Sequence, residues 1–322
     1  MEKIAFVFPG QGAQKIGMAK DFYDTFESSK EVFRAANEVL DVDIEKICFE
    51  EEEKINLTEY TQPALLTACT AMLQPVCEIV KPDMAAGLSL GEYTALVACK
   101  AMDFKDAAKL TRVRGKYMQN EVPVGVGGMY AVLGAKNELV QEVCDHIEDV
   151  YVANYNCPGQ IIISGKMEAL AAAKKELVEQ GVKRVMPLKV SGPFHSGMLV
   201  GAGEKLAKEL EPININTLEI PYVTNVTAEV VTKEDEIKTL LEKQVSSSVR
   251  WEESIRRMLK EGVGTFIEIG PGHTLTSLIK KIDRQVKVIN VETVEDLEKL
   301  REAFQLSLIH ISEPTRRRGI SY

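Results

Sequence analysis

The sequence predicts an α/β protein with a largely parallel sheet and a second, smaller unit inserted into it. Short apolar runs rich in β-branched and aromatic residues alternate with amphipathic stretches towards both ends of the chain, as in parallel α/β sheets. Between them, residues 126–190 change to the order strand, helix, strand, strand, helix, strand. That order is typical of a ferredoxin-like (βαββαβ) unit.

The elements of the larger unit are expected in two stretches on either side of the small one. Before it we expect a strand at 4–8, several helical segments, a strand at 84–89 and helices from about 91 to 119. After it we expect a strand at 220–225, helices at about 235–245 and 251–261, a strand at 264–270, a helix from about 273, a strand at 286–291 and a last helix near 292–304. The expected domains are therefore a discontinuous α/β core, residues 1–125 and 191–305, and a ferredoxin-like subdomain, residues 126–190.

The last residues, 306–322, differ from the rest of the chain. LSLIHISEPTR resembles a translated reading frame of the mosaic-end adaptor used in transposase-based sequencing libraries, and RRRGISY follows it. We expect this stretch to be a non-native tail and exclude it from fold and site reasoning. The alternative is a natural basic tail that docks a partner.

Composition excludes several classes of protein. With 45% hydrophobic residues in a chain of 322, a substantial core is available. The formal net charge of -9 argues against a nucleic-acid binder, which needs a basic surface. No stretch approaches the ~18 apolar residues of a membrane span, and the six cysteines form neither a redox pair nor a zinc-binding pattern. We therefore expect a cytoplasmic protein that holds no metal and does not enter a membrane. We also expect a monomer.

A serine between glycines, in Gly87–Gly91 (GLSLG), follows a predicted strand and precedes a predicted helix. This is the context of the GxSxG turn that exposes a nucleophilic serine in α/β-hydrolase folds, so the core is predicted to be α/β-hydrolase-like. Glycines suit so sharp a turn, and the helix N-terminus favours negative charge near Ser89. The pattern also occurs by chance, so a catalytic role for Ser89 depends on finding a base.

Four histidines are candidates for that base, because a serine hydroxyl needs a group that accepts its proton. His146 lies among acidic residues of a predicted helix, which indicates a surface position. His273 follows a Gly-Pro-Gly turn at a predicted helix start, which indicates capping or exposure, and His310 lies in the excluded tail. His195, in VSGPFHS after the last strand of the small unit, is the best candidate. The alternative for it is a hydrogen-bonded structural histidine.

Several dispersed segments carry a closer resemblance. They are FPGQGAQ (8–14), GLSLGEY (87–93), RVRGKYMQ (112–119), NYNCPGQ (154–160), GPFHS (192–196), residues 244–251 and EIGPG (268–272). With these motifs in this order, the chain resembles the bacterial malonyl-CoA:acyl carrier protein transacylases, which are related to the acyltransferase domains of fatty-acid and polyketide synthases. The resemblance covers residues 1 to about 305.

The resemblance implies transfer of malonyl from malonyl-CoA to the phosphopantetheine thiol of acyl carrier protein, through a malonyl-serine intermediate, for fatty-acid biosynthesis. It implies Ser89 as nucleophile and His195 as general base and acid. The main-chain N–H groups of Gln11 and Leu90 would form the oxyanion hole, which agrees with the rule that the residue after the nucleophile supplies one donor. A main-chain carbonyl in the region of Gln244 would orient the imidazole. No cofactor is implied.

Three residues are expected at the substrate, namely Arg114, Gln244 and Phe194. Arg114 matches the arginine that binds the free carboxylate of malonate in this family, and a guanidinium can hold a carboxylate through two charge-assisted hydrogen bonds. Arg112 is the competing arginine, but helical spacing places it on another face, so only one of the two should line the cleft. Phe194 resembles the bulky residue that accompanies preference for malonyl over methylmalonyl.

The implied partner, acyl carrier protein, is acidic and would be repelled by the overall charge of the chain. It must therefore dock on a local basic patch, unless these residues are ordinary solvated charges. The candidates are Lys116, Lys183, Arg184, Lys189, Arg250, Arg256, Arg257, Lys280 and Lys281.

One departure from the family pattern is Leu88, which stands where the family usually has a histidine before the serine. That histidine is not the base in the family, so the chemistry should survive, and the replacement bears instead on the packing of the site and on acyl selectivity. Three other functions remain open: an acyltransferase acting in trans for a polyketide synthase, a serine esterase or thioesterase, and an inactive carrier-protein binding module. The esterase should show the order Ser, Asp, His and lack a carboxylate clamp.

Overall fold

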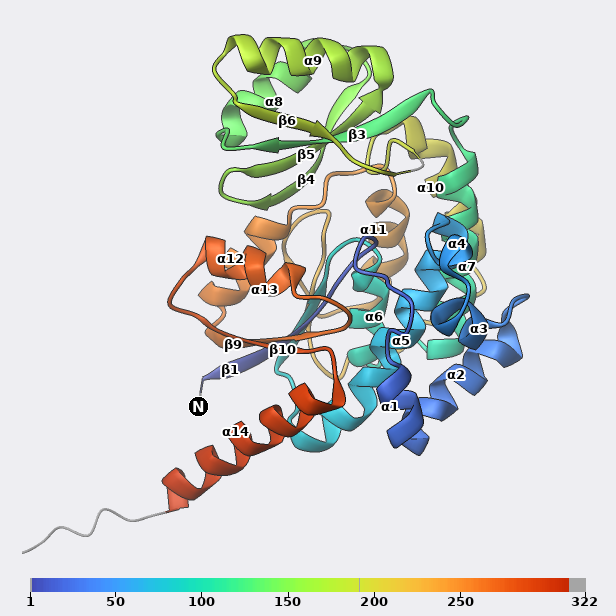
Figure 1. Cartoon of the computed structure of the whole chain (residues 1–322), viewed down its shortest axis with the longest axis vertical. Coiled ribbons are helices and arrows are strands. Elements are labelled where there is room, and N and C mark those ends of the chain that lie inside the picture. The colour runs from blue at the N-terminus through green and yellow to red at the C-terminus, as the bar shows by residue number, and fades with distance from the viewer. Residues whose placement is uncertain (1, 191, 313–322) are drawn as a thin grey trace, which may run out of the picture.

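The computed structural model of the chain describes residues 2–190 and 192–312, with side chains as far as residue 305. Two separate sheets organise it: sheet A in the body of the molecule and sheet B at one end, coloured green in Figure 1. The prediction of an α/β protein with a largely parallel sheet is confirmed. The predicted non-native tail falls mostly outside the described residues, although the backbone of the last helix, α14, continues to Ser312.

Sheet A has six strands in the spatial order β10-β9-β1-β2-β7-β8, and only β7 and β8 pair antiparallel. The strands are β1 (Lys3–Phe8), β2 (Met84–Gly87), β7 (Tyr222–Val223), β8 (Val230–Val231), β9 (Val263–Ile269) and β10 (Lys287–Val291). The strand expected at 220–225 is thus only two residues long. β8 was not predicted, because a two-residue strand has no hydrophobic period to detect.

Helices cover both faces of sheet A, and the alternation of side chains along β1 divides the core between them. Phe6 and Phe8 join a large cluster with α5, whereas Ala5 and Val7 join a second cluster with α12 and α13. The helices before sheet B are α1 (Lys20–Thr25), α2 (Glu27–Val39), α3 (Ile44–Phe49), α4 (Glu52–Ile55), α5 (Thr58–Ile79), α6 (Gly91–Ala98) and α7 (Phe104–Asn120). Those after it are α10 (Val200–Leu210), α11 (Ile237–Gln244), α12 (Trp251–Lys260), α13 (Thr274–Ile282) and α14 (Val294–Ser312).

Sheet B is antiparallel throughout, in the spatial order β4-β5-β3-β6. In chain order it runs β3 (Gly127–Leu133), α8 (Asn137–His146), β4 (Val150–Cys157), β5 (Gln160–Lys166), α9 (Met167–Glu179) and β6 (Arg184–Pro187), which is the predicted βαββαβ succession. Its two helices cover one face around an apolar cluster of their own. The other face turns towards the large core, where Met129, Ala131 and Ile162 join the main cluster. The domain boundaries at 126 and 190 stay predictions.

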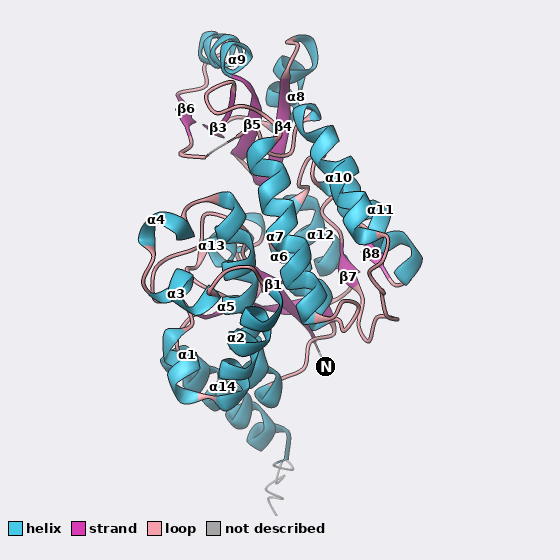
Figure 2. Cartoon of the chain, turned by 90° about the vertical axis from the view of Figure 1, so that its right-hand side faces the viewer, coloured by secondary structure: helices cyan, strands magenta, loops and turns pink. Residues whose placement is uncertain are grey.

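A short segment after α11 connects the two sheets. Val249 bridges to β4: its N–H donates to the carbonyl of Ala153 at 2.8 Å, and its carbonyl accepts from the N–H of Tyr155 at 2.9 Å. The hydroxyl of Ser248 donates to the carbonyl of Val152. Figure 2 shows sheet B at one end of the molecule, with α7 and α10 reaching towards it from the body. This connection fixes sheet B over the ends of the core strands.

Candidate active site

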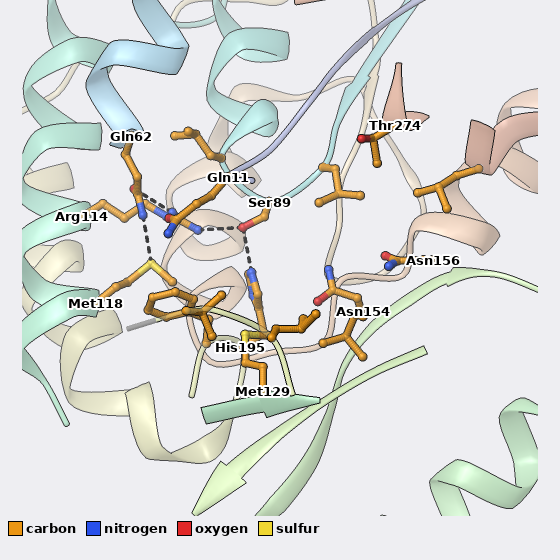
Figure 3. A pocket seen from close by; sticks show the side chains of 17 residues that line it. Gln11, Gln62, Ser89, Arg114, Met118, Met129, Asn154, Asn156, His195 and Thr274 are labelled. Carbon is orange, nitrogen blue, oxygen red and sulfur yellow. Dashed lines mark hydrogen bonds between the residues drawn. The ribbon is translucent and has the colours of Figure 1, made fainter. Parts of the chain in front are cut away.

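A cavity of about 220 Å³ lies between the ends of the sheet A strands and the inner face of sheet B. Its polar lining residues come from separate parts of the chain; they are Gln11, Gln62, Ser89, Arg114, Asn154, Asn156, His195 and Thr274. In Figure 3, the side chains of Ser89, Arg114 and His195 point towards one another. Its apolar wall includes Leu88, Met118, Met129, Ile162 and Phe194. The fold therefore brings together motifs that are more than a hundred residues apart.

The turn at Ser89 is as sharp as the sequence predicts. A Cβ atom on Gly87 would lie 1.9 Å from the carbonyl carbon of Gly91, and one on Gly91 would lie 2.2 Å from the carbonyl oxygen of Phe8. Only glycine fits at either position. Ser89 itself has φ of 52°, a left-handed conformation that is costly for a residue with a side chain. Such strain persists only where the surroundings hold it in place.

Asn225, just beyond β7, holds this turn. Its Oδ1 accepts the N–H of Ser89 at 2.6 Å, and its Nδ2 donates to the carbonyl of Gly87 at 2.7 Å. The Asn225 side chain is fully buried, and its bond to Gly87 lies in the protein interior. One amide therefore ties the end of β2 to the serine that follows it.

The hydroxyl of Ser89 lies 2.7 Å from Nε2 of His195. The other ring nitrogen, Nδ1, faces two main-chain carbonyls, Gln244 at 2.9 Å and Ser247 at 3.2 Å. Because carbonyls only accept, Nδ1 carries the hydrogen and the neutral ring presents a free lone pair on Nε2. That lone pair faces the serine proton, which is the arrangement a general base requires. Within the described part of the chain, no carboxylate takes part in orienting the ring.

His195 also has a left-handed backbone, with φ of 57°, and only 4% of it is exposed. Burial and, next, the positive charge of Arg114 lower its pKa to about 4, although the two carbonyls partly oppose this shift. The imidazole is therefore neutral, and able to accept a proton, throughout the neutral pH range.

Arg114, on α7, is almost completely buried beside this pair. Its Nη2 donates to Gln244 Oε1 at 2.9 Å and to Ser89 Oγ at 3.3 Å, and its Nη1 donates to Gln62 Oε1 at 2.8 Å. Its guanidinium carbon lies 5.5 Å from the ring centre of Tyr93. No carboxylate forms an ion pair with Arg114 among residues 2–190 and 192–305. The guanidinium therefore presents a positive charge to the cavity and to the serine.

Arg112 faces a different direction, as the helical spacing predicts. It forms ion pairs at 2.8 Å with Asp41 and with Glu59, and it lies over the ring of Tyr60 at 4.5 Å. It is absent from the cavity lining. Its contacts instead hold α7 against the start of α5.

The other predicted site residues fall in two groups. Gln11, Leu90 and Phe194 line the cavity, and the main-chain N–H groups of Gln11 and Leu90 have no acceptor among the described residues. Gln244 is fully buried behind Arg114 and does not line the cavity, so its side chain contacts the guanidinium rather than the open space. Its carbonyl lies at the His195 ring, as expected from the resemblance.

Sequence reasoning missed three buried polar residues, Gln62, Glu92 and Asn225. Asn225 follows a short strand at the same end of the sheet as Ser89, and Glu92 follows the serine by one helical turn, so position alone could have drawn attention to both. Burial raises the pKa of Glu92, and the hydrogen bonds that it accepts from Gln244 and Asn225 only partly oppose this, so that the pKa is about 7. Gln62 lies in an almost wholly buried helix, where nothing in the pattern distinguishes it.

The remaining histidines lie elsewhere. His146 is exposed and pairs with Glu176 at 2.9 Å, and His273 is exposed at the start of α13. His310 lies outside the described side chains. In the part of the chain that the structure describes, no group of His, Cys, Asp and Glu side chains is arranged to hold a metal ion. None of the described helices is long and apolar enough to cross a bilayer.

Comparison with known proteins places these features in a family. The model of the family described as "Acyl transferase domain" matches residues 5–310. A malonyl CoA-acyl carrier protein transacylase of Bacillus subtilis (strain 168) is 45% identical over an alignment of 304 residues, and the match covers 92% of this chain and 96% of the relative.

Solved structures give the same result. The malonyl CoA-acyl carrier protein transacylase of Clostridium perfringens ATCC 13124 has a TM-score of 0.93 and 44% identity, covering 97% of this chain and 100% of that one. A malonyl-transacylase solved in complex with its type II polyketide synthase acyl-carrier protein has a TM-score of 0.90 and 37% identity, covering 94% of this chain and 99% of that one.

Proposed function

The chain belongs to the acyl transferase domain family, and on that premise we propose that it transfers malonyl from malonyl-CoA to the phosphopantetheine thiol of an acyl carrier protein. The resemblance predicted from the dispersed motifs is thereby confirmed. We further propose that sheet A with its helices is an α/β-hydrolase-like core, on the support of a sharp turn that places Ser89 between the end of β2 and the start of α6.

The reaction divides into two acyl transfers on Ser89. In the first, Ser89 Oγ attacks the thioester carbonyl carbon while His195 Nε2 accepts the hydroxyl proton. The C–S bond then breaks, and the imidazolium returns the proton to the departing coenzyme A sulfur. In the second, His195 takes the proton of the carrier-protein thiol, whose sulfur attacks the malonyl-serine ester. Ser89 leaves as the alcohol after regaining that proton.

The charge that develops on the carbonyl oxygen needs donors that are already in position. We assign this role to the main-chain N–H groups of Gln11 and Leu90. In support, Leu90 directly follows the nucleophile and Gln11 lies in the loop after β1, on the lining of the same cavity. The N-terminus of α6 adds a favourable dipole at the same point.

The single observation that carries the choice of substrate is the buried guanidinium of Arg114 beside Ser89 Oγ, with no ion-pair partner among the described residues. A carboxylate on the acyl group would complete this site by accepting from the guanidinium, whereas an acetyl group would leave the cation unpaired. We therefore assign Arg114 to the malonyl carboxylate. A serine hydrolase of apolar esters would gain nothing from a cation in this place.

Fatty-acid biosynthesis is the setting that we propose, with acyl carrier protein and a coenzyme A thioester as partners and no cofactor beyond them. A second setting, transfer in trans to a polyketide carrier, is favoured by one observation, the similar transacylase solved with such a carrier protein. Lys189 supports docking of an acidic carrier near the site, because it is exposed and lines a cavity beside Gln11. We propose that the protein acts as a cytoplasmic monomer.

The test is a transfer assay with malonyl-CoA, acetyl-CoA and a holo acyl carrier protein. We expect malonyl-protein to accumulate, with a kcat/KM for malonyl-CoA that exceeds the value for acetyl-CoA. Rapid hydrolysis of both thioesters without transfer would instead support the esterase alternative. Comparing fatty-acid and polyketide carrier proteins in the same assay decides between the two settings.

A further inference from the structure

Glu92 carries a buried carboxyl group that takes no part in the proposed reaction. It lies on α6, one turn after Ser89, and no part of it is exposed. Its Oε2 accepts from Nε2 of Gln244 at 2.6 Å and from the main-chain N–H of Asn225 at 3.1 Å. Burying a carboxyl group costs free energy unless hydrogen bonds compensate, so its presence here calls for a reason beyond packing.

The amide of Gln244 connects Glu92 to the active site. Its Nε2 donates to Glu92 Oε2 and, at 3.0 Å, to the main-chain carbonyl of Ser89. Its Oε1 accepts from Nη2 of Arg114. Because an amide nitrogen only donates and a guanidinium cannot accept, these neighbours allow the amide a single orientation. Glu92 is the partner on the donor side with the shortest bond.

Arg114 depends on that orientation. Two amide oxygens hold its guanidinium, those of Gln62 and Gln244, and its Nε has no hydrogen-bond partner among the described residues. Among the residues that the structure describes, Gln62 donates in turn only to the weak acceptor Sδ of Met118, at 3.6 Å. Of the two amides, Gln244 alone is thus anchored by a carboxyl group. A rotated Gln244 amide would present its nitrogen to the guanidinium and repel it from Ser89.

We propose that Glu92 is a positioning residue, which fixes the Gln244 amide and thereby holds the Arg114 guanidinium beside Ser89. Through this relay Glu92 sets the preference for acyl groups that carry a carboxylate. The inference rests on the proposed function, because the preferred acyl group is the malonyl group that Arg114 would bind. The bond from Asn225 to the same oxygen supports the serine turn, so its loss would affect every acyl substrate equally.

Two substitutions separate the relay from general support of the fold. Glu92→Gln keeps an oxygen that can accept from the Gln244 amide. Glu92→Met gives a side chain of similar length that has no such oxygen. We expect Glu92→Met to lower kcat/KM for malonyl-CoA roughly tenfold or more beyond any loss with acetyl-CoA, and Glu92→Gln to restore most of that selectivity. In an Arg114→Ala background, Glu92→Met should have no selective effect, because the group on which it acts is gone.

A purely structural role predicts the opposite pattern. Equal losses for the two thioesters, or a selective loss that persists without Arg114, would overturn the proposal, and so would a Glu92→Gln variant as poor as Glu92→Met. If Glu92→Met does not fold, as judged by its Tm, Gln244→Met replaces it. That change keeps the main-chain carbonyl used by His195 and should give the same selective loss.

A crystal structure of the Glu92→Met variant tests the role of Glu92 independently of whether the protein transfers malonyl. Wild-type transfer of malonyl, measured in the same assay, decides the proposed function by itself. Whatever that result, the Glu92→Met structure should show a rotated Gln244 amide and an Arg114 Nη2 displaced from Ser89 Oγ, which lie 3.3 Å apart in the wild type. An Arg114 that remains in place would contradict the relay.

Discussion

The two sides of the cavity are built differently. The side from sheet A and its helices presents Ser89 and Arg114, which rest on the fully buried side chains of Glu92, Asn225 and Gln244. The opposite side, from sheet B, is mostly apolar, with two asparagines along β4. Its pocket-lining Met129 and Ile162 belong to the same apolar cluster as the main core.

The difference indicates a division of tasks. A network of buried, hydrogen-bonded polar groups holds one geometry, because any rearrangement leaves a polar atom unpaired. An apolar wall imposes shape only, and it can be reshaped at the cost of packing. Changes on the sheet A side should therefore alter bond making and the recognition of charge, whereas changes on the sheet B side should alter which acyl groups fit.

Removal of the proposed base, His195, should have the largest effect on transfer. His195→Ala leaves Ser89 without a proton acceptor, so we expect acylation by malonyl-CoA to slow by roughly 10³-fold or more. Stopped-flow or quenched measurement of acyl-enzyme formation checks this. His146→Ala, a change at an exposed histidine on sheet B's outer helix, is the matched control and should leave the rate unaltered. A similar rate in His195→Ala would assign the base to another group.

Arg114→Ala should come next, with a loss that depends on the substrate. We expect malonyl transfer to lose about 2 to 5 kcal/mol, mostly because the malonyl carboxylate is left unpaired in a partly buried site. Acetyl transfer should be unchanged or improved, and Arg114→Lys should recover only part of the loss, because an ammonium lacks the planar fork. The measurement is kcat/KM for both thioesters.

Arg112→Ala is the matched control, two residues away on the same helix. It breaks ion pairs with Asp41 and Glu59 outside the cavity, so it should affect Tm more than selectivity. Equal losses of malonyl and acetyl transfer in Arg114→Ala would assign Arg114 to structure. A selective loss in Arg112→Ala would identify that residue as the clamp instead.

The pH dependence of kcat/KM tests the sheet A side further, because the positive charge of Arg114 affects the pKa of His195. The pKa of about 4 keeps the base neutral above that pH, so kcat/KM for acetyl-CoA should fall only as the pH drops towards 4. Removing the Arg114 charge makes the imidazolium easier to form and raises this pKa, so the acidic limb should move to higher pH in Arg114→Ala. An unmoved limb would contradict the electrostatic contact between the two residues.

The smallest effect on malonyl transfer is expected from a substitution in the apolar wall that sheet B contributes to the cavity. Met129→Ala enlarges the cavity without touching a hydrogen bond of the site, so malonyl transfer should change by less than about tenfold. Transfer of a bulkier thioester such as methylmalonyl-CoA should improve relative to malonyl-CoA. Met186→Ala, at an exposed methionine of the same sheet, should change neither. A loss as large as that of Arg114→Ala would refute the division of tasks.

Most of the fold could be predicted from the sequence, because its long strands and helices carry clear hydrophobic periods. The strands of sheet B are one example. The turn at Ser89 is another, because backbone contacts allow only glycine at positions 87 and 91, and the sequence shows both glycines. The supporting network could not be predicted. The positions of Asn225 and Glu92 near Ser89 could draw attention to each residue, but the hydrogen bonds of the network join segments more than 130 residues apart, which no local pattern specifies.

The roles assigned to Ser89 and to a carrier protein can be tested together by one measurement, intact mass spectrometry. After mixing with malonyl-CoA, the wild-type protein should gain the mass of one malonyl group, located on Ser89 by peptide mapping, and should lose it when holo acyl carrier protein is added. Ser89→Ala should gain nothing. An adduct of equal yield in Ser89→Ala, or one that water removes as fast as the carrier protein does, would contradict a malonyl transferase acting through Ser89.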